Sequence, residues 1–490
     1  MWSDLADPAA LETAISALRS VLPPPAVDAA PIVTRLPSAA TPEHVAHLCH
    51  QIPGFVWLDG AETRHLLFQD PLAVICSRDG RVTVDGPDGS AAFDAKSLDA
   101  VDAALKAWPA SSGSILTGWI SYEVGAELEP STCGQLNTAL PQLQFGLYDS
   151  VLIYGPAGWV WHRTNAWREP AAPHALLARA ELLSLSGFAE PNKPVPEATG
   201  EAAFVSSVAH LVERIHAGDL FQTNLCRRLE FSFDPDQAWP LYRRMRTLNP
   251  ASSGAFLQLG HGRAILSGSP EMFLRVRDGT VESTPIKGTR RRGCTEAEDL
   301  QLAQDLLNSE KDRAELAMVV DVTRNDLSRV CLPGTVEVPE HATLMTLPTL
   351  HHTYSRVAGR LRPTANAADL LKAAFPPASI TGAPKIAAME AAFREEGVVR
   401  GPCMGAIGWL ALNGDIELSV SIRTAYTDGG KLTYLAGCGI TAESDPAAEF
   451  AESQAKAAAF LAALKTCEDP CGPAIAASPN DGAHEVPSQT

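Results

Sequence analysis

A proline-rich stretch at residues 190–197 divides the chain into two parts of different character. Before it, short apolar runs such as 72–76 and 151–154 are separated by Asp-Gly and Gly-Pro turns, which is typical of strands. After it, short apolar strands alternate with amphipathic segments that predict helices at 201–217, 296–318, 366–375 and 446–465. The stretch itself predicts a linker or a crossover loop.

The chain has 490 residues, which exceeds one ordinary domain core and predicts either two domains or one large intertwined domain. We expect an N-terminal region of residues 1–190, a second domain of residues 198–466 and a disordered polar tail of residues 467–490. Strands mixed with helices in this way predict an α+β or mixed α/β fold.

The composition excludes several classes of protein. No run reaches the roughly 18 apolar residues of a membrane span, and the first residues lack the basic and apolar segments of a signal peptide. A formal charge of −18 without a basic run argues against nucleic-acid binding. The ten cysteines are scattered without a CxxC pair, which argues against a zinc site and favours reduced thiols. We therefore expect a cytoplasmic protein.

The first motif with catalytic side chains brings an acid and an amine together. The segments 267–271 and 285–289 flank a turn at Asp278-Gly279, so Glu271 and Lys287 are expected near each other across a hairpin. Such a pair can serve as general acid and nucleophile. The alternative is a surface salt bridge, which this pattern alone favours.

Two acidic pairs are expected on helical faces. Asp312 and Glu315 share one face, as do Glu449, Glu452 and Lys456. Carboxylates from two helices can form a site for Mg²⁺, a hard cation that prefers oxygen ligands. Two solvated charged faces are the alternative and the more common origin of each pair.

Two further segments suit an anion. The segment 379–385 places a glycine-containing turn before a predicted helix and can present amides to an anion, although the GxxxxGK[ST] spacing of a phosphate loop is absent. Arg423 ends a predicted strand, and Gly437 and Gly439 are expected in the next turn, an arrangement that suits a carboxylate. A structural arginine beside a tight turn is equally compatible.

In this order, the five segments resemble the chorismate-utilising enzymes, which include anthranilate, aminodeoxychorismate, isochorismate and salicylate synthases. The resemblance runs from about residue 200 to 465, with a weaker match around 118–122. It implies a body of two antiparallel sheets packed face to face, with helices outside and the pocket between. It also makes 1–190 an anthranilate-synthase-like region and 198–466 the chorismate-binding catalytic domain.

The resemblance assigns a role to each acidic residue. Glu271 is implied to be the general acid that helps the C4 hydroxyl of chorismate leave. Glu315 and Glu452 are implied to bind Mg²⁺ directly, and Asp312 and Glu449 through water. The metal is implied to hold the ring carboxylate and to withdraw electron density from it.

The remaining pocket residues follow in the same way. Arg423 and the amides of Gly437 and Gly439 are implied to hold the enolpyruvyl carboxylate. His352 is implied to act near the leaving hydroxyl, with a buried structural histidine as the alternative. The further contacts implied are Thr289, Thr381, Gly382, Ala383 and Lys456.

Two positions favour one branch of the family. Isochorismate and salicylate synthases usually carry a lysine base where this chain has Gln222, and a glutamine cannot act as a base. Anthranilate synthases typically read Pro-Ile-Ala-Gly-Thr where this chain has Lys287. The resemblance thus implies that Lys287 forms a covalent adduct at C2, which ammonia then displaces by adding at C4.

The implied product is 4-amino-4-deoxychorismate, the precursor of 4-aminobenzoate for folate. The chain has no nucleophilic-elbow cysteine of a glutaminase, so ammonia is expected from a separate glutamine amidotransferase subunit in a hetero-complex. The alternatives are anthranilate synthase component I, the same amination in secondary metabolism, and a catalytically silent binding subunit. Cys438 and Trp409 depart from the usual glycine and tyrosine of the family.

Overall fold

The computed structural model describes residues 8–25, 31–60, 64–132, 138–164, 166–185, 200–347 and 350–465. The expected linker at 190–197 and the expected polar tail at 467–490 lie outside the described residues.

Two large sheets organise the described chain, and every strand pairing in them is antiparallel. The first sheet has eleven strands in the order β1 (Ile32–Leu36), β10 (Gly158–Arg163), β9 (Ser150–Gly155), β3 (His65–Phe68), β2 (Val56–Asp59), β12 (Ser253–Gly260), β13 (Arg263–Ser269), β22 (Thr424–Asp428), β23 (Lys431–Ile440), β11 (Gln222–Ser232) and β19 (Gly382–Ala383).

The second sheet has twelve strands, one of which, β17 (Glu337–Thr346), pairs with β18 outside the main path. The others run in the order β16 (Ile286–Arg291), β18 (Leu350–Arg360), β15 (Thr280–Ser283), β14 (Met272–Arg277), β21 (Ile416–Val420), β20 (Ala406–Ala411), β7 (Ile115–Ile120), β8 (Leu143–Tyr148), β4 (Ala73–Arg78), β5 (Arg81–Gly86) and β6 (Gly89–Asp94).

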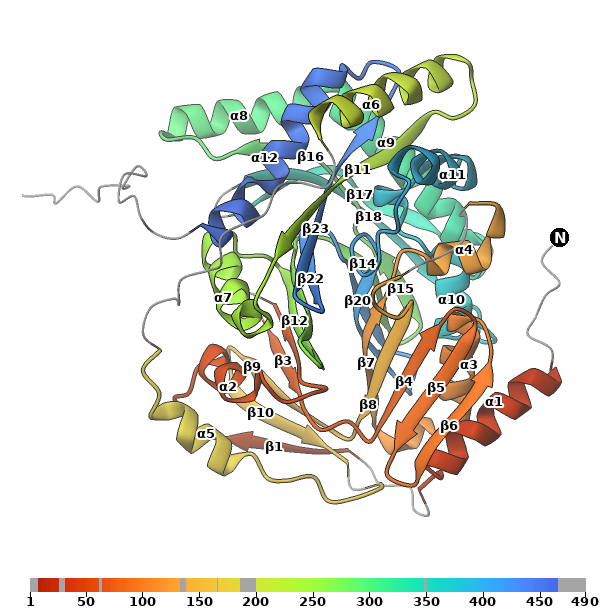
Figure 1. The fold of residues 1–490 in the computed structure, drawn as a ribbon, viewed down its shortest axis with the longest axis vertical. Coiled ribbons are helices and arrows are strands. Elements are labelled where there is room, and N and C mark those ends of the chain that lie inside the picture. The colour runs from red at the N-terminus through yellow and green to blue at the C-terminus, as the bar shows by residue number, and fades with distance from the viewer. Residues whose placement is uncertain are drawn as a thin grey trace, which may run out of the picture.

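Helices cover the outside of this pair of sheets (Figure 1). They are α1 (Pro8–Val21), α2 (Pro42–Cys49), α3 (Ser97–Ala107), α4 (Val124–Leu128), α5 (His174–Glu181), α6 (Glu201–His216), α7 (Ala238–Leu248), α8 (Glu296–Asn308), α9 (Glu310–Ser328), α10 (Ala367–Ala374), α11 (Lys385–Glu396) and α12 (Pro446–Leu464). Among the described residues, no helix is both long and apolar enough to cross a bilayer.

The two sheets pack face to face over one apolar core. Leu257 and Ile265 from the first sheet lie in the same buried cluster as Leu116, Ile407 and Leu418 from the second. Each sheet joins strands from before and after residues 186–199, through the pairs β2–β12 and β7–β20. The predicted fold of two face-packed antiparallel sheets with helices outside is therefore confirmed.

Two local expectations need correction. The predicted helix at 296–318 is interrupted at Ser309, whose extended backbone ends α8 and whose hydroxyl accepts the amide of Asp312 to cap α9. Gly437 and Gly439 do not form a turn; they lie within β23, opposite Cys226 and Asn224 of β11. The first difference arises from the local cap at Ser309, and the second arises because β23 pairs with the distant strand β11.

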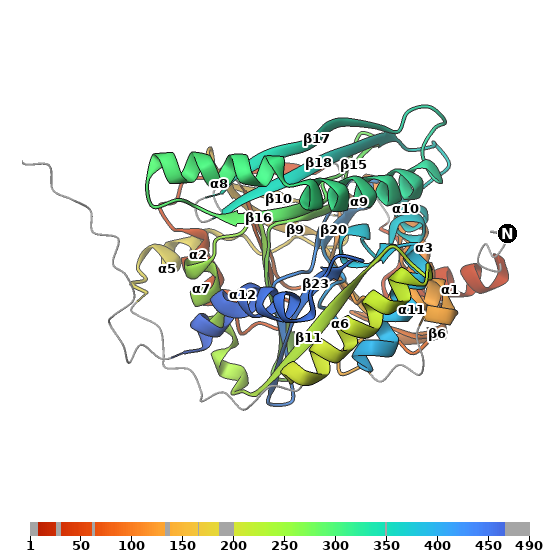
Figure 2. The same cartoon turned by 90° about the horizontal axis from the view of Figure 1, so that it is seen from above.

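The elements that carry the predicted site gather at one end of the molecule. Figure 2 shows α8 and α9 crossing one sheet while α12 and β23 lie below them. At the start of α12, Asp445 accepts the amide of Ala448, and Pro446 occupies the first turn. This cap fixes Glu449 and Glu452 on successive positions of one helical face.

Candidate active site

Glu271 lies in the tight connection between β13 and β14, where its amide donates to the hydroxyl of Ser269 at 3.2 Å. Its side chain is buried. Burial raises the pKa of Glu271 to about 7, against the opposing influence of the Ser379 hydroxyl and the Lys287 charge. A carboxyl group that is partly protonated near neutral pH can donate a proton to a leaving hydroxyl.

Lys287 reaches the same place from β16. A bulge between Lys287 and Thr289 interrupts the pairing with β18, and the residue between them, Gly288, has a φ of +81°. A side chain there would also approach Cβ of Asp312 to 3.1 Å. The Lys287 charge lowers the pKa of both Glu271 and Glu315, so the lysine side chain is near both acids. The predicted proximity of Glu271 and Lys287 is thus present in the structure.

Three polar groups converge on Gly439 of β23. The Gln222 side-chain amide donates to Glu315 at 3.4 Å, and a Cβ atom on Gly439 would lie 2.5 Å from that amide nitrogen. The same Cβ atom would lie 3.4 Å from the Glu315 carboxylate and 3.6 Å from Nζ of Lys287. Position 439 therefore requires glycine, because these side chains leave no room for a Cβ atom. The buried side-chain carbonyl oxygen of Gln222 has no hydrogen-bond partner among the described residues and can accept one from a bound molecule.

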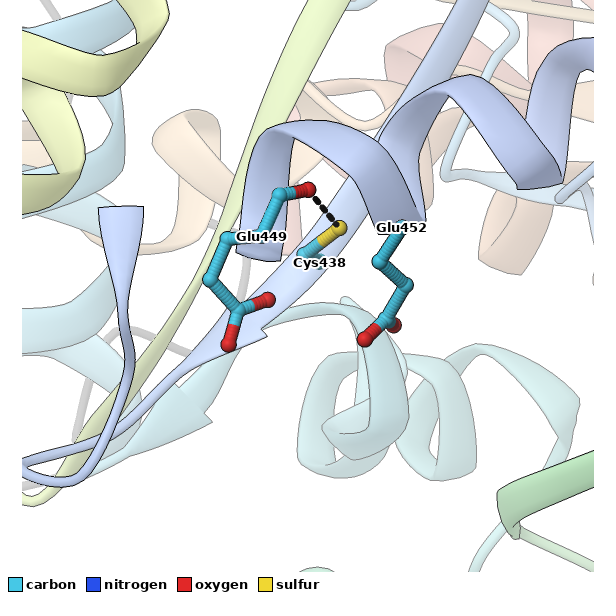
Figure 3. A group of neighbouring side chains, drawn as sticks. All are labelled: Cys438, Glu449 and Glu452. Atoms are coloured by element: carbon cyan, nitrogen blue, oxygen red, sulfur yellow. Dashed lines mark hydrogen bonds between the residues drawn. The ribbon is translucent and has the colours of Figure 1, made fainter. Parts of the chain in front are cut away.

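Glu449 and Glu452 project from α12 toward β23 (Figure 3). Ligand atoms of these two residues and of Cys438 lie within 4.8 Å of one another. Glu449 accepts the hydroxyl of Ser444 at 2.7 Å and lies 3.6 Å from Nζ of Lys311. Asp312 and Glu315 of α9 are not members of this group; Asp312 instead accepts from Arg290 at 3.0 Å.

The donor atoms in this region suit a hard cation. Burial raises the pKa of the Cys438 thiol to about 12, and the thiol donates to the main-chain oxygen of Glu449, so sulfur is not presented as a thiolate ligand. The carboxylates of Glu449, Glu452 and Glu315 remain, and oxygen ligands of this kind fit Mg²⁺. The electrostatic influence of Glu452 on Glu315 shows that the two helices share one acidic region.

Three lysines neutralise this acidic region. Burial disfavours the ionised form of Glu452, but Lys456 at 2.7 Å, with Lys311 and Lys287, leaves its pKa below the ordinary value. The pKa of Glu315 is raised because burial outweighs the charges of Lys287 and Lys311. Lys456 also donates to the carbonyl of Gly437 at 3.0 Å, which ties α12 to β23.

His352 is buried on β18, beside the bulge that follows Lys287. Its Nδ1 atom lies 2.9 Å from the hydroxyl of Thr289 and 3.3 Å from the carbonyl of Gly288. Burial, together with the charge of Arg423, lowers the pKa of His352 to about 4. The imidazole is consequently neutral at pH 7, and its buried Nε2 atom has no hydrogen-bond partner.

Arg423 lies between β21 and β22 with a φ of +50°. Its carbonyl accepts the amide of Gly268 at 3.0 Å, and this bond holds the left-handed backbone in place. Among the described residues, its guanidinium group has no ion pair. Burial lowers its pKa, yet a guanidinium group stays charged in proteins. A half-buried, unpaired cation of this kind fits a carboxylate.

The 381–383 segment packs directly against β11. The Thr381 hydroxyl donates to the main-chain oxygens of Pro377 and Ala378, at 3.1 and 3.2 Å. Gly382 has a φ of +149°, and a side chain on it would meet the Gln222 carbonyl at 2.1 Å. Ala383 pairs with Gln222. These residues hold the start of β11 in position, which places Gln222 beside Glu315.

The site also contains residues that the sequence did not single out as functional. Lys311 stands next to Asp312 within the acidic motif, and Ser379 opens the glycine-containing turn, so both lay within recognised segments. A lysine one residue from an acidic pair is common on solvated helices, and a serine before a turn is common everywhere. No sequence signal distinguishes these two from such surface residues.

Comparison with known proteins agrees with the fold. A family described as chorismate binding enzyme matches residues 53–462. The chain belongs to this family of chorismate-utilising enzymes, which includes anthranilate synthase and aminodeoxychorismate synthase.

Relatives from both branches are similar to it. Aminodeoxychorismate synthase component 1 of Salmonella typhimurium is 37% identical over 69% of this chain and 73% of its own length. Anthranilate synthase component 1 of Methanothermobacter marburgensis is 33% identical over 82% of this chain and 87% of its own length. The crystal structure of anthranilate synthase component I from Streptococcus pneumoniae TIGR4 superposes with a TM-score of 0.67 at 27% identity, covering 81% of this chain and 92% of that one.

Proposed function

We propose that this protein aminates chorismate at C4 with ammonia and so produces 4-amino-4-deoxychorismate, the precursor of 4-aminobenzoate for folate, in the cytoplasm. The observation that carries the proposal is the position of Lys287. Its Nζ atom would lie 3.6 Å from a Cβ atom on Gly439, and its charge acts on the pKa of both Glu271 and Glu315. A lysine that makes no ion pair with another described residue, and that stands beside a buried acid, can act as a nucleophile once it is unprotonated.

The proposed reaction has two displacements. The unprotonated amine of Lys287 forms a bond from Nζ to C2 of chorismate as the two conjugated ring double bonds shift and the C4–O bond breaks. Glu271 gives its proton to the departing hydroxyl, which leaves as water. Ammonia then bonds to C4, the double bonds shift back, and the C2–N bond to Lys287 breaks. The new C4 ammonium group returns one proton to Glu271, so the net change replaces a hydroxyl group by an amino group and regenerates both Lys287 and Glu271.

Gln222 supports ammonia as the nucleophile. Its amide donates to Glu315, and its carbonyl oxygen is unpartnered. Neither group can take a proton from water, so the residue cannot generate hydroxide. The carbonyl oxygen can instead accept an N–H bond, which suits an amine.

For the metal, the proposed ligands are Glu315 and Glu452 directly, with Asp312 and Glu449 acting through water. When bound, Mg²⁺ supplies positive charge that holds and polarises the ring carboxylate. The chain's own contribution is an acidic region in which Lys311 and Lys456 hold the carboxylates in place.

For the substrate, the proposed contacts use the unpaired groups of the pocket. Arg423 and the amides of Gly437 and Gly439 would hold the enolpyruvyl carboxylate. The bare Nε2 atom of His352 would accept a hydroxyl hydrogen at the leaving group. The remaining proposed contacts are Thr289, Thr381, Gly382, Ala383 and Lys456.

A separate glutamine amidotransferase subunit is the proposed source of ammonia. Two relatives from different branches carry the designation component 1, which supports a second component. The main alternative is anthranilate synthase component I, favoured by the similarity over 82% of this chain. Lys287 argues against it, because amination at C2 has no use for an amine that attacks C2 itself. The 4-amino product could also serve secondary metabolism.

A product assay tests the proposal. The purified chain is incubated with chorismate, Mg²⁺ and excess ammonium at alkaline pH, and half of each sample then receives an aminodeoxychorismate lyase. We expect 4-aminobenzoate only in the half with lyase. Fluorescent anthranilate without lyase would transfer the assignment to anthranilate synthase. Absence of any aminated product would indicate a silent binding subunit.

A further inference from the structure

A groove lies on the surface at residues other than those of α12, the helix that carries Glu449 and Glu452. It has a volume of about 760 Å³ and is lined by α4, α9, α10, α11 and the segment before α11. Two exposed apolar side chains, Phe221 and Ile386, lie at this groove, with 72% and 43% of their surface accessible. The proposed reaction assigns no function to this groove.

A second, much smaller cavity lies against Glu271. The space in which the centre of a water-sized molecule can move is about 10 Å³. This is about the space that a single such molecule needs. Ser379 lines it with a buried hydroxyl group that makes no hydrogen bond of good geometry, although the hydroxyl is near enough to favour the ionised form of Glu271. Chorismate cannot enter a space of this size, but ammonia, a molecule as small as water, can.

One residue, Asp326 of α9, lines both the groove and the small cavity. It is 4% exposed and accepts Nζ of Lys385 at 2.6 Å and Nη2 of Arg329 at 2.8 Å. Lys385 also donates to the carbonyls of Ala374 and Pro376, both at 2.9 Å. Groove and cavity therefore meet at Asp326, whose contacts to Lys385 and Arg329 are made by side chains.

We propose that ammonia reaches the active site through this groove, passes the Asp326–Lys385 pair and occupies the small cavity beside Glu271 and Ser379. The inference rests on the proposed function, since it assumes an aminating enzyme. In this proposal ammonia and chorismate reach the site by different paths, because the small cavity admits ammonia and excludes the larger chorismate. Asp326 already holds an amine through N–H bonds, so an N–H donor of similar chemistry can take the place of Lys385 during passage.

The position of the cavity fits the second displacement. Ammonia has three N–H groups and one lone pair, and the cavity presents two oxygen acceptors, from Ser379 and Glu271. Hydrogen bonds to both would hold the molecule next to the residue that releases the C4 hydroxyl. The nucleophile would thus wait where the leaving group departs, which is a positioning effect.

Filling the cavity tests the route. Ser379→Thr adds one methyl group, and Ala374→Val adds two, from different elements that line the same space. The control is Ala209→Val, which adds the same two methyl groups at an exposed position of α6, outside both the groove and the small cavity. Steady-state rates are measured with the chain alone, at saturating chorismate and varied ammonium, after thermal unfolding has shown that each variant is folded.

We expect kcat/KM for ammonium to fall about tenfold or more in both filled variants, while KM for chorismate and the control stay within about twofold of wild type. Equal kcat/KM for ammonium in a folded filled variant and in wild type would overturn the route and show that ammonia enters with chorismate. An equal fall of kcat/KM for ammonium and for chorismate would also overturn the route, because it would indicate a general distortion of the active site. If wild type forms no aminated product, the proposed function itself has failed, which is a different result.

Discussion

Nδ1 of His352 lies 2.9 Å from the Thr289 hydroxyl, and on the other side of the ring the Nε2 atom is buried without a hydrogen-bond partner. The Gly288 carbonyl, 3.3 Å from Nδ1, can only accept, so it favours the tautomer with the proton on Nδ1. The Nε2 atom then carries a free lone pair, which can accept a hydrogen bond. A protonated ring would lose this function.

The first prediction concerns the pH dependence of stability. Because the pKa of His352 is lowered to about 4 from an ordinary 6.5, the unfolded chain binds more protons between these values, and stability falls as pH falls through this window. Between pH 7 and pH 4, the free energy of unfolding of His352→Gln should therefore fall by about 3 kcal/mol less than that of wild type. Urea unfolding at both pH values measures this. An identical pH dependence in the two proteins would show that His352 is not held neutral.

The second prediction concerns Glu271. The pKa of its carboxyl group is raised to about 7 by burial, so a general acid at this position loses its proton as pH rises through 7. At a constant concentration of free ammonia, we expect kcat/KM for chorismate to fall above about pH 7. Glu271→Gln should lower kcat about 100-fold or more and abolish this decline. A variant that keeps the wild-type pH profile would exclude Glu271 as the acid.

The third prediction concerns the covalent adduct. Incubation with chorismate and Mg²⁺ but without ammonium should add to the protein the mass of chorismate less one water. Lys287→Ala should show no such addition and no 4-amino product. Lys431→Ala is the control, because Lys431 is an exposed lysine paired with Glu230 at 3.5 Å. Mass spectrometry of the intact protein distinguishes these cases, and 4-amino product from Lys287→Ala would refute the covalent role.

The sequence was informative where the site is built from local structure. Glu271 and Lys287 are separated by a single hairpin, whose turn at Asp278-Gly279 has both residues at positive φ. A turn signal and two apolar runs suffice to predict such a neighbourhood. The capped start of α12 likewise follows from Asp445 and Pro446.

The sequence was not informative where distant strands meet. Gln222 reaches Glu315 only because β11 pairs with β23 and β19, and these pairings join residues more than a hundred positions apart. The local sequence around Gly437 and Gly439 is compatible with a turn. It is equally compatible with a strand in which neighbouring groups leave no room for a side chain. The break at Ser309 was missed for a different and local reason, since apolar periodicity continues through it while the side-chain cap of Ser309 redirects the backbone.

The fourth prediction concerns Mg²⁺ affinity. If Glu315 and Glu452 are direct ligands, Glu315→Gln and Glu452→Gln should each weaken Mg²⁺ binding by at least about tenfold, and Asp312→Asn and Glu449→Gln by less. The control is Asp321→Asn, an acid 74% exposed on α9. Calorimetric titration of the purified chain with MgCl₂ measures binding without catalysis. Affinities equal to that of the control would show that the cation binds elsewhere.

The fifth prediction concerns a buried ion pair behind the site. Arg400 pairs with Glu396 at 2.7 Å, both almost fully buried, and its guanidinium group also donates to the carbonyls of Asn224 and Ile380. Its amide donates to Glu123, so this residue joins the two parts of the chain. Removal of one partner leaves the other charge buried without compensation, which typically costs about 3–5 kcal/mol.

We therefore expect Arg400→Met to lower the free energy of unfolding by about 3–5 kcal/mol in urea titrations. The matched control is Arg394→Met, which removes an exposed pair with Glu390 on α11 and should cost less than about 1 kcal/mol. Because Asn224 lies opposite Gly439 and Ile380 precedes Thr381, folded Arg400→Met should also bind chorismate more weakly. Equal losses of stability in the two variants would mean that the buried carboxylate of Glu396 finds compensation elsewhere, in the amide of Cys226 that it already accepts at 2.7 Å.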